Sequence, residues 1–169
     1  DRGSFHESWN LKQFNKAIGY EVDFVQDNES CSSIGVLRGM HYQIYPNAQS
    51  KLVRVNSGSI FDVIIDVREK SETFAEWAGI TLDDKKKEQL WIPQGFAHGF
   101  LALKRRVIVS YKVNKYWSSI CERTLLWNDA SINIKWPFQK YKIEKPLISI
   151  KDGKGDYLKD LVSRGEIFR

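Results

Sequence analysis

The chain has 169 residues, of which 42% are hydrophobic, and a formal net charge of +5. This length fits one domain with a sizeable core, and the composition excludes a mainly disordered protein. No apolar run approaches the roughly 20 residues that a membrane helix needs, and the only two cysteines, Cys31 and Cys121, fit no disulfide framework or metal-ligand spacing. We therefore expect a soluble protein of the reducing cytoplasm.

The basic balance is compatible with a nucleic acid, a membrane surface or a small anionic ligand. The densest charged run, Asp83-Asp84-Lys85-Lys86-Lys87-Glu88, mixes both signs and lies between two strand-like segments, which is typical of a solvated turn. No basic stripe with interleaved aromatic residues is visible, so we expect neither a nucleic-acid nor a membrane partner.

The chain opens at Asp1-Arg2-Gly3, which has the chemistry of a turn with no strand in front of it. We therefore expect an N-terminal strand to be missing and the numbering to begin inside a longer polypeptide. From there on, no Pro/Gly-rich linker and no repeat of fixed period divides the chain, so residues 1–169 are predicted to form a single domain.

Alternation with a period of two residues is the main structural signal. In Lys51-Leu-Val-Arg-Val55 it places Lys51 on one face with two valines. The run Ser59–Val67 follows a Ser-Gly turn and is rich in β-branched residues, as expected of a central strand. Further strands are predicted at 74–82, 89–92, 98–103 and 107–113.

Convincing helical spacing is confined to Tyr157–Val162 near the C-terminus. Short, closely spaced strands with few helices predict an antiparallel β-sandwich or barrel, with small helices at its ends. The fold class is therefore all-β.

The first candidate for chemistry is Gly35-Val-Leu-Arg-Gly-Met-His-Tyr-Gln43, where Arg38 and His41 lie three residues apart. An imidazole is a base near neutral pH, and a guanidinium binds anions. Taken alone, however, a histidine in an apolar run is more often a satisfied core residue.

A second candidate is Tyr111 in the strand 107–113, where alternation places its ring on the face of three valines. Its hydroxyl then points into an apolar interior, needs a partner, and is kept protonated by desolvation. An aromatic residue in such a place is more often part of the core than a catalyst.

A third candidate is His98, which follows a Pro/Gly turn and lies between small residues that allow a ligand to approach the backbone. An ordinary turn residue is an equal alternative. The three histidines show no His-x-His or His-x-x-x-His pattern, so we expect no metal. Since Gly-x-Gly-x-x-Gly, Walker and Gly-x-Ser-x-Gly motifs are also missing, cofactor-free chemistry is left.

Many ordered blocks of the chain resemble the dTDP-4-dehydrorhamnose 3,5-epimerase family of cupin-type sugar-nucleotide epimerases, nearly from end to end. These blocks are Asp1–Glu7, Gln26–Asn28, Gly35–Gln43, Lys51–Val55, Asp62–Arg68, Ile92–Phe100, Tyr111-Lys112, Trp127–Asp129 and Leu147–Asp152.

The resemblance implies a jelly-roll fold and an isomerase that inverts C3, C5 or both in a 4-keto-6-deoxy sugar nucleotide of dTDP-rhamnose biosynthesis. It implies that His41 is the general base, oriented by Asp152, and that Tyr111 is the general acid on the opposite face of the sugar. Lys51, on an interior strand face, is suited to stabilise the enolate oxygen. No cofactor is required for these proton transfers.

By the same resemblance, eight side chains hold the nucleotide diphosphate and the sugar: Arg2, Glu7, Gln26, Asn28, Arg38, His98, Glu122 and Lys151. The N-terminal arm of such cupins generally reaches a neighbouring subunit. The resemblance therefore implies a homodimer in which Arg2 and Glu7 act across the interface.

One position departs from the family pattern. Where a second tyrosine commonly stacks on the thymine, this chain reads Tyr116-Trp117, and matched spacing assigns the position to Trp117. The larger indole face leaves a GDP-linked 4-keto sugar open as the substrate. A cupin-type 3,4-ketoisomerase and a non-catalytic binding module are the remaining alternatives.

Overall fold

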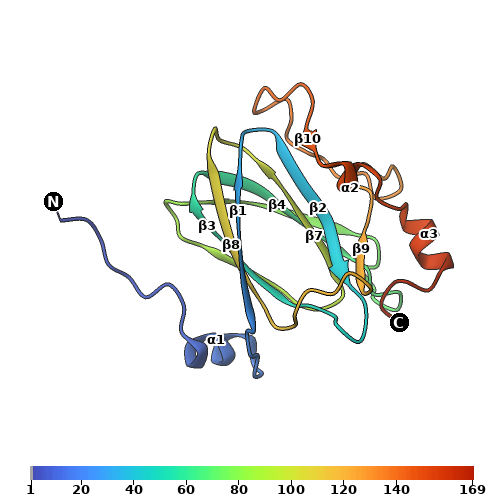
Figure 1. Cartoon of the computed structure of the whole chain (residues 1–169), viewed down its shortest axis with the longest axis horizontal. Coiled ribbons are helices and arrows are strands. Elements are labelled where there is room, and N and C mark those ends of the chain that lie inside the picture. Colours follow the sequence, from blue (N-terminus) through green and yellow to red (C-terminus); the bar gives the residue numbers. More distant parts are fainter. Residues whose placement is uncertain (1) are drawn as a thin grey trace.

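The computed structural model describes residues 2–169 and consists of two β-sheets packed face to face (Figure 1). The four-stranded sheet has the order β1 (Gln26–Ser32), β8 (Val107–Val113), β3 (Lys51–Ser57), β6 (Gln89–Ile92). The six-stranded sheet has the order β10 (Leu147–Ile148), β2 (Val36–Gln43), β7 (Phe96–Ala102), β4 (Ser59–Asp66), β5 (Trp77–Asp83), and β9 (Glu122–Thr124) pairs with β2. The predicted β-sandwich is confirmed.

The space between the sheets is filled by alternate residues of both. Val53 and Val55 of β3 and Val109 of β8 meet Ile60 of β4 and Phe100 of β7 in one buried cluster. The faces predicted from alternation are therefore correct, and they carry Lys51 and Tyr111 toward the same interior as these apolar residues.

The C-terminal third of the chain covers the outer face of the six-stranded sheet (Figure 1). Leu158 and Leu161 of α3 (Leu158–Ser163) pack with Met40 and Val63 on that face, and Phe168 belongs to the same cluster. This face is therefore also buried, which explains why β4 has no exposed position.

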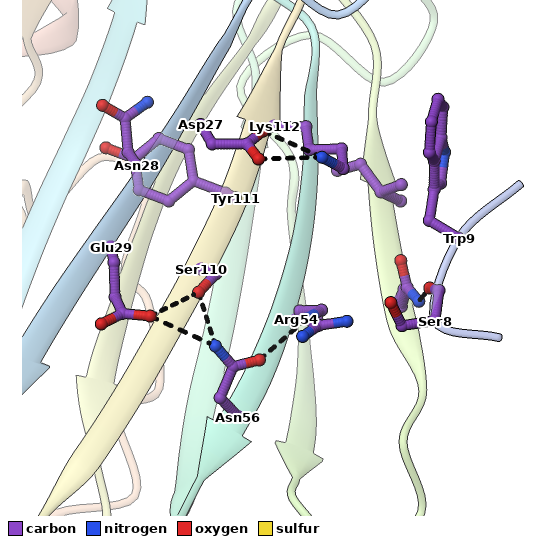
Figure 2. Close-up of a pocket in the computed structure, with 12 residues that line it drawn as sticks. Ser8, Trp9, Asp27, Asn28, Glu29, Arg54, Asn56, Ser110, Tyr111 and Lys112 are labelled. Carbon is purple, nitrogen blue, oxygen red and sulfur yellow. Dashed lines mark hydrogen bonds and ion pairs between the residues drawn. The ribbon is translucent and has the colours of Figure 1, made fainter. Parts of the chain in front are cut away.

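The outer face of the four-stranded sheet is polar and hollowed by a pocket of about 440 Å³ (Figure 2). Lys112 of β8 forms an ion pair with Asp27 of β1 at 2.9 Å. The Ser110 hydroxyl donates to the Glu29 carboxylate at 3.1 Å, and Asn56 donates to Ser110 at 2.6 Å. These contacts join side chains of β1, β8 and β3 across the floor of the pocket.

Two short helices were not predicted from the sequence. The helix α1 (Leu11–Ile18) begins at Asn10, whose side chain accepts from the backbone N–H of Gln13 at 3.1 Å, and ends at Gly19 with φ +83°. Its capping residues and the helical spacing of its apolar residues were the sequence signals for it. The helix α2 (Ile150–Gly153) is a single turn with an N-cap at Ser149. The predicted C-terminal helix is confirmed as α3.

The strand predicted at 74–82 begins only at Trp77. The preceding residues turn instead, because the buried Asp66 carboxylate accepts hydrogen bonds from the hydroxyls of Ser71 and Thr73 at 2.6 and 2.7 Å. Side-chain bonds of this kind compete with a strand ladder for the local backbone.

A β-bulge in β2 decides which residues face the interior. Strict alternation would place Arg38 and His41 on opposite faces, but the register between β2 and β7 shifts between them. Gly39 has φ +117°, and a Cβ atom there would lie 2.5 Å from Cα of Gly99 in β7. Glycine is therefore required on both sides of this close approach.

We predict that Gly39→Ala destabilises the protein by roughly 2–4 kcal/mol, since it adds a strained backbone conformation to an overpacked contact. Thermal and denaturant unfolding would measure the change. Gly153→Ala is the matched control, because its φ is not positive and its nearest neighbour lies 4.0 Å away. Equal stability of the two variants would contradict the role assigned to the bulge.

Candidate active site

Two adjoining hollows of about 370 and 110 Å³ open between the sheets and share four lining residues. The shared residues are Asn28, His41, Lys51 and Tyr111. His41 comes from β2 of the six-stranded sheet and Tyr111 from β8 of the opposing sheet. The two side chains therefore line one polar cavity, which we call the central cavity, from opposite walls.

His41 is paired with a carboxylate from a different part of the chain. Its Nε2 atom lies 2.6 Å from Oδ1 of Asp152, and Oδ2 of Asp152 accepts from the backbone N–H of Gly39 at 3.3 Å. Ser149 caps the turn that carries Asp152. Because Nε2 faces the carboxylate, Nδ1 is the ring nitrogen left free for substrate.

Asp152 is buried, with only 4% of the residue exposed. Burial opposes its ionisation, but the hydrogen bond and charge of His41 and the bond from Gly39 outweigh it and hold the pKa of Asp152 below its usual value. The carboxylate thus stays ionised at neutral pH, where it fixes the tautomer of His41 and stabilises its protonated form.

Lys51 lies beside this pair, with Nζ donating to the backbone carbonyl of His41 at 3.1 Å. Burial lowers the pKa of Lys51 to about 8, although the negative charges of Asp62 and Glu122 act in the opposite direction. The Lys51 amine is therefore mainly protonated at neutral pH and loses its proton as the pH rises through about 8.

Tyr111 is largely desolvated. Burial raises the pKa of its phenol, with Glu122 adding to the rise and Arg38 opposing it. The hydroxyl is accordingly protonated at neutral pH and available as a proton donor in the central cavity.

A second histidine–carboxylate pair lies deeper. Nε2 of His98 is 2.8 Å from Oδ1 of Asp62, and Oδ2 of Asp62 is buried with no hydrogen-bond partner. His98 lies within β7, not in a turn. Sequence reasoning missed Asp62, although a carboxylate in the apolar run of β4 requires a partner and could have been found on that ground.

The remaining candidate residues line the two hollows with polar groups. Lys151 and Glu122 form an ion pair at 2.6 Å, and Arg38 donates to the Ser32 hydroxyl at 3.1 Å. Gln26 donates to Asn28 at 2.8 Å. Together with His98 and Trp117, these residues surround the central cavity.

Arg2 and Glu7 are not brought to this cavity within one chain. Arg2 is exposed, and Glu7 accepts from the Asn10 side chain at 3.1 Å on the far side of the four-stranded sheet, beside a separate hollow. The N-terminal arm, residues 2–9, has no regular structure; its first residues run out from the sandwich (Figure 1), whereas Ser8 and Trp9 lie against the four-stranded sheet.

Residues 2–169 contain no group of three or more His, Cys, Asp or Glu side chains arranged to hold a metal ion. Within the same range no helix has the length and apolarity needed to span a membrane. The central cavity instead presents a base, a protonated phenol and an ammonium, which suit proton removal beside a carbonyl group and its return from the other side.

Comparison with known proteins agrees with this chemistry. A family model described as dTDP-4-dehydrorhamnose 3,5-epimerase matches residues 1–160. The dTDP-4-dehydrorhamnose 3,5-epimerase of Shigella flexneri is 50% identical over 160 residues, which are 95% of this chain and 86% of that protein.

Solved structures show the same relationship. The dTDP-6-deoxy-D-glucose-3,5-epimerase of Legionella pneumophila, in complex with dTDP-4-keto-L-rhamnose, superposes with a TM-score of 0.92 at 39% identity, covering 100% of this chain and 87% of that one. A 3'-monoepimerase of Streptomyces bikiniensis, in complex with dTDP-quinovose, gives a TM-score of 0.90 at 28% identity, with coverages of 98% and 82%. The predicted cupin-type fold is thereby confirmed, and the chain belongs to the dTDP-4-dehydrorhamnose 3,5-epimerase family of isomerases.

Proposed function

We propose that this chain inverts C3 and C5 of dTDP-4-keto-6-deoxyglucose by stepwise proton transfer. The observation that carries the proposal is that the His41–Asp152 pair and the protonated phenol of Tyr111 line one cavity from opposite sheets. A base on one side of a sugar ring and an acid on the other are what inversion at carbon requires.

In the proposed reaction, Nδ1 of His41 removes the proton from a carbon next to the C4 ketone. The electron pair of the broken C–H bond moves into the ring, and the ketone oxygen becomes an enolate oxygen that the Lys51 ammonium stabilises. Asp152 stabilises the imidazolium that forms. Tyr111 then donates its proton to the opposite face of the same carbon, and solvent restores both groups for the second carbon.

In this proposal, the polar residues that line the cavity bind the diphosphate, the sugar and the nucleotide base. Arg38 and Lys151 supply positive charge for the diphosphate, and His98 with Asp62 borders the sugar end. Gln26, Asn28 and Glu122 line the smaller hollow with Trp117, whose exposed indole stacks on the nucleotide base in this proposal.

We also propose a homodimer in which the N-terminal arm completes the site of the neighbouring subunit. Phe5 is 99% exposed in the single chain, and neither Arg2 nor Glu7 lines the central cavity. The open outer face of the four-stranded sheet (Figure 2) provides a surface on which a second copy can pack. An arm with an unburied aromatic side chain is well suited to such an exchange.

We place the enzyme in the cytoplasm. Cys31 is exposed and Cys121 is buried, and both are free thiols. An exposed free thiol is best preserved in a reducing compartment.

The proposed reaction predicts that the protein incorporates solvent deuterium at C3 and C5 of dTDP-4-keto-6-deoxyglucose, as followed by proton NMR. His41→Ala should abolish exchange, because no base remains. Tyr111→Phe should still exchange deuterium while the rate of inversion falls by roughly 10²- to 10⁴-fold, since His41 can return the label to the same face but the opposite acid is gone.

Exchange at one carbon alone would identify a monoepimerase. Movement of the ketone from C4 to C3 would identify a ketoisomerase. If exchange appeared only with a GDP-linked 4-keto sugar, the dTDP assignment would be wrong. Equal exchange in His41→Ala and the unsubstituted protein would exclude His41 as the base.

The lowered pKa of Lys51 predicts a pH dependence. Lys51 carries its charge below pH 8 and loses it above, so kcat/KM should fall as pH rises through about 8. Lys51→Arg should displace this descending limb to higher pH, and Lys51→Met should lower kcat by roughly 10²- to 10³-fold. A limb that stays at the same pH in Lys51→Arg would assign it to another group.

The exchanged arm predicts complementation between two inactive variants. The first is His41→Ala with an intact arm, and the second combines Arg2→Ala with Glu7→Ala in an otherwise intact body. After unfolding and refolding together, mixed dimers contain one complete site, so activity should return to roughly a quarter of the unsubstituted level. If each arm served its own subunit, the mixture would stay inactive.

A further inference from the structure

The segment that carries Trp117 connects β8 to β9 and forms one wall of the smaller hollow. The Trp117 side chain is not fixed by packing, because the residue is 57% exposed. The place of its indole over the central cavity therefore depends on how the backbone on either side of it is held.

Gln43, the last residue of β2, makes that attachment. Its Oε1 atom accepts from the backbone N–H of Ser118 at 2.7 Å. Its Nε2 atom donates to the backbone carbonyls of Tyr116 at 3.2 Å and of Asn47 at 2.6 Å. The amide thus bonds the peptide groups immediately before and after Trp117, and Gln43 itself is only 3% exposed.

Two further glutamines bind the same segment. Oε1 of Gln26 accepts from the N–H of Trp117 at 3.2 Å, and Nε2 of Gln49 donates to the carbonyl of Lys115 at 2.7 Å. Among these three glutamines only Gln43 is buried and bonds the segment at two points. It is therefore the main anchor of the Trp117 backbone.

We propose that Gln43 is a positioning residue that determines how tightly the enzyme holds the nucleotide base, acting through Trp117. This inference rests on the proposed function, in which Trp117 stacks on the base. An apolar residue in place of Gln43 leaves one backbone N–H and two backbone carbonyls without their hydrogen-bond partner. The backbone on either side of Trp117 is then less restrained, and so is the position of the indole.

The catalytic groups are held independently of the Gln43 side chain. The backbone of β2 pairs with β9 from His41 to Gln43, and His41 is fixed by its bond to Asp152. Loss of the Gln43 amide should therefore weaken binding of the base while the chemical step proceeds at saturating substrate.

The test compares Gln43→Met with the unsubstituted protein by titration calorimetry, with thymidine 5'-diphosphate and inorganic pyrophosphate as separate probes. We expect the Kd of thymidine diphosphate to rise about tenfold, as for loss of one base–aromatic stack. The Kd of pyrophosphate should not change, and the KM for the 4-keto sugar nucleotide should rise while kcat stays within about threefold of its original value.

The same substitution in a Trp117→Ala background separates positioning from general distortion. If Gln43 acts through the indole, Gln43→Met should change the Kd of thymidine diphosphate by less than about twofold there. Gln139→Met, at an exposed glutamine that lines neither hollow, is the control for the substitution itself. Should Gln43→Met fail to fold, Gln43→Glu keeps an acceptor for Ser118 and removes both donors, and the same pattern is expected.

Three results would overturn the inference: unchanged binding of thymidine diphosphate in the Gln43 variants, an equal loss of pyrophosphate binding, or a full effect that persists without the indole. Trp117→Ala that binds thymidine diphosphate normally would also overturn it. Binding of the diphosphate requires no turnover, so failure of the proposed reaction would appear separately, as absence of deuterium exchange in the unsubstituted protein.

Discussion

Ionisable side chains lie between the largely apolar inner faces of the two sheets, and each is stable there because a polar group faces it. Asp152 faces His41, Asp62 faces His98, and Lys51 bonds to a backbone carbonyl with two carboxylates nearby. Burying a charged group without such a partner costs several kcal/mol of folding free energy, and the pKa of the group then shifts in favour of its neutral form. Burial and pairing together set the protonation states of the groups to which we assign the chemistry. Burial raises the pKa of Tyr111 and lowers that of Lys51, while the partners of Asp152 keep it ionised.

The bulge in β2 is the second constraint, because it gathers groups that a regular strand would separate. With the register shift at Gly39, Arg38 and His41 both border the central cavity, and the N–H of Gly39 becomes a ligand of the Asp152 carboxylate. A single irregularity therefore supplies both a cation on the wall of the cavity and part of the hydrogen-bond network around His41 and Asp152. Removing the glycine pair would affect fold and site together, since Gly39 and Gly99 define the separation of β2 and β7 at this point.

Sequence alternation predicted much of this fold, since a period of two correctly placed Lys51 and Tyr111 on interior faces. It failed where the chain departs from regular geometry. The bulge between Arg38 and His41 has no signature in alternation. The helix α1 was overlooked although Leu11, Phe14 and Ile18 recur with helical spacing between two capping residues. The resemblance to a family supplied Asp152, which no local pattern connects to His41 across more than a hundred residues. The carboxylate of Asp62 in an apolar run indicated that it needs a partner, but only the tertiary structure identifies that partner as His98. Gln43 was missed because its role is defined by backbone groups of a distant segment.

In the proposed reaction, the fixed positions of base and acid limit how two carbons can be inverted. His41 and Tyr111 project from opposing sheets and are held by ladder pairing on both sides, so they cannot exchange places between steps. The sugar must therefore turn between them while the nucleotide stays bound, which requires a firm anchor at the base and looser contacts at the ring. The buried Gln43 amide fixes the backbone around Trp117 beside the smaller hollow, where the proposal places the base. The sugar then lies in the larger hollow, whose walls are side chains from both sheets. A rigid base subsite thus becomes the pivot about which a mobile ring can present first one carbon and then the other to the same pair of catalytic groups.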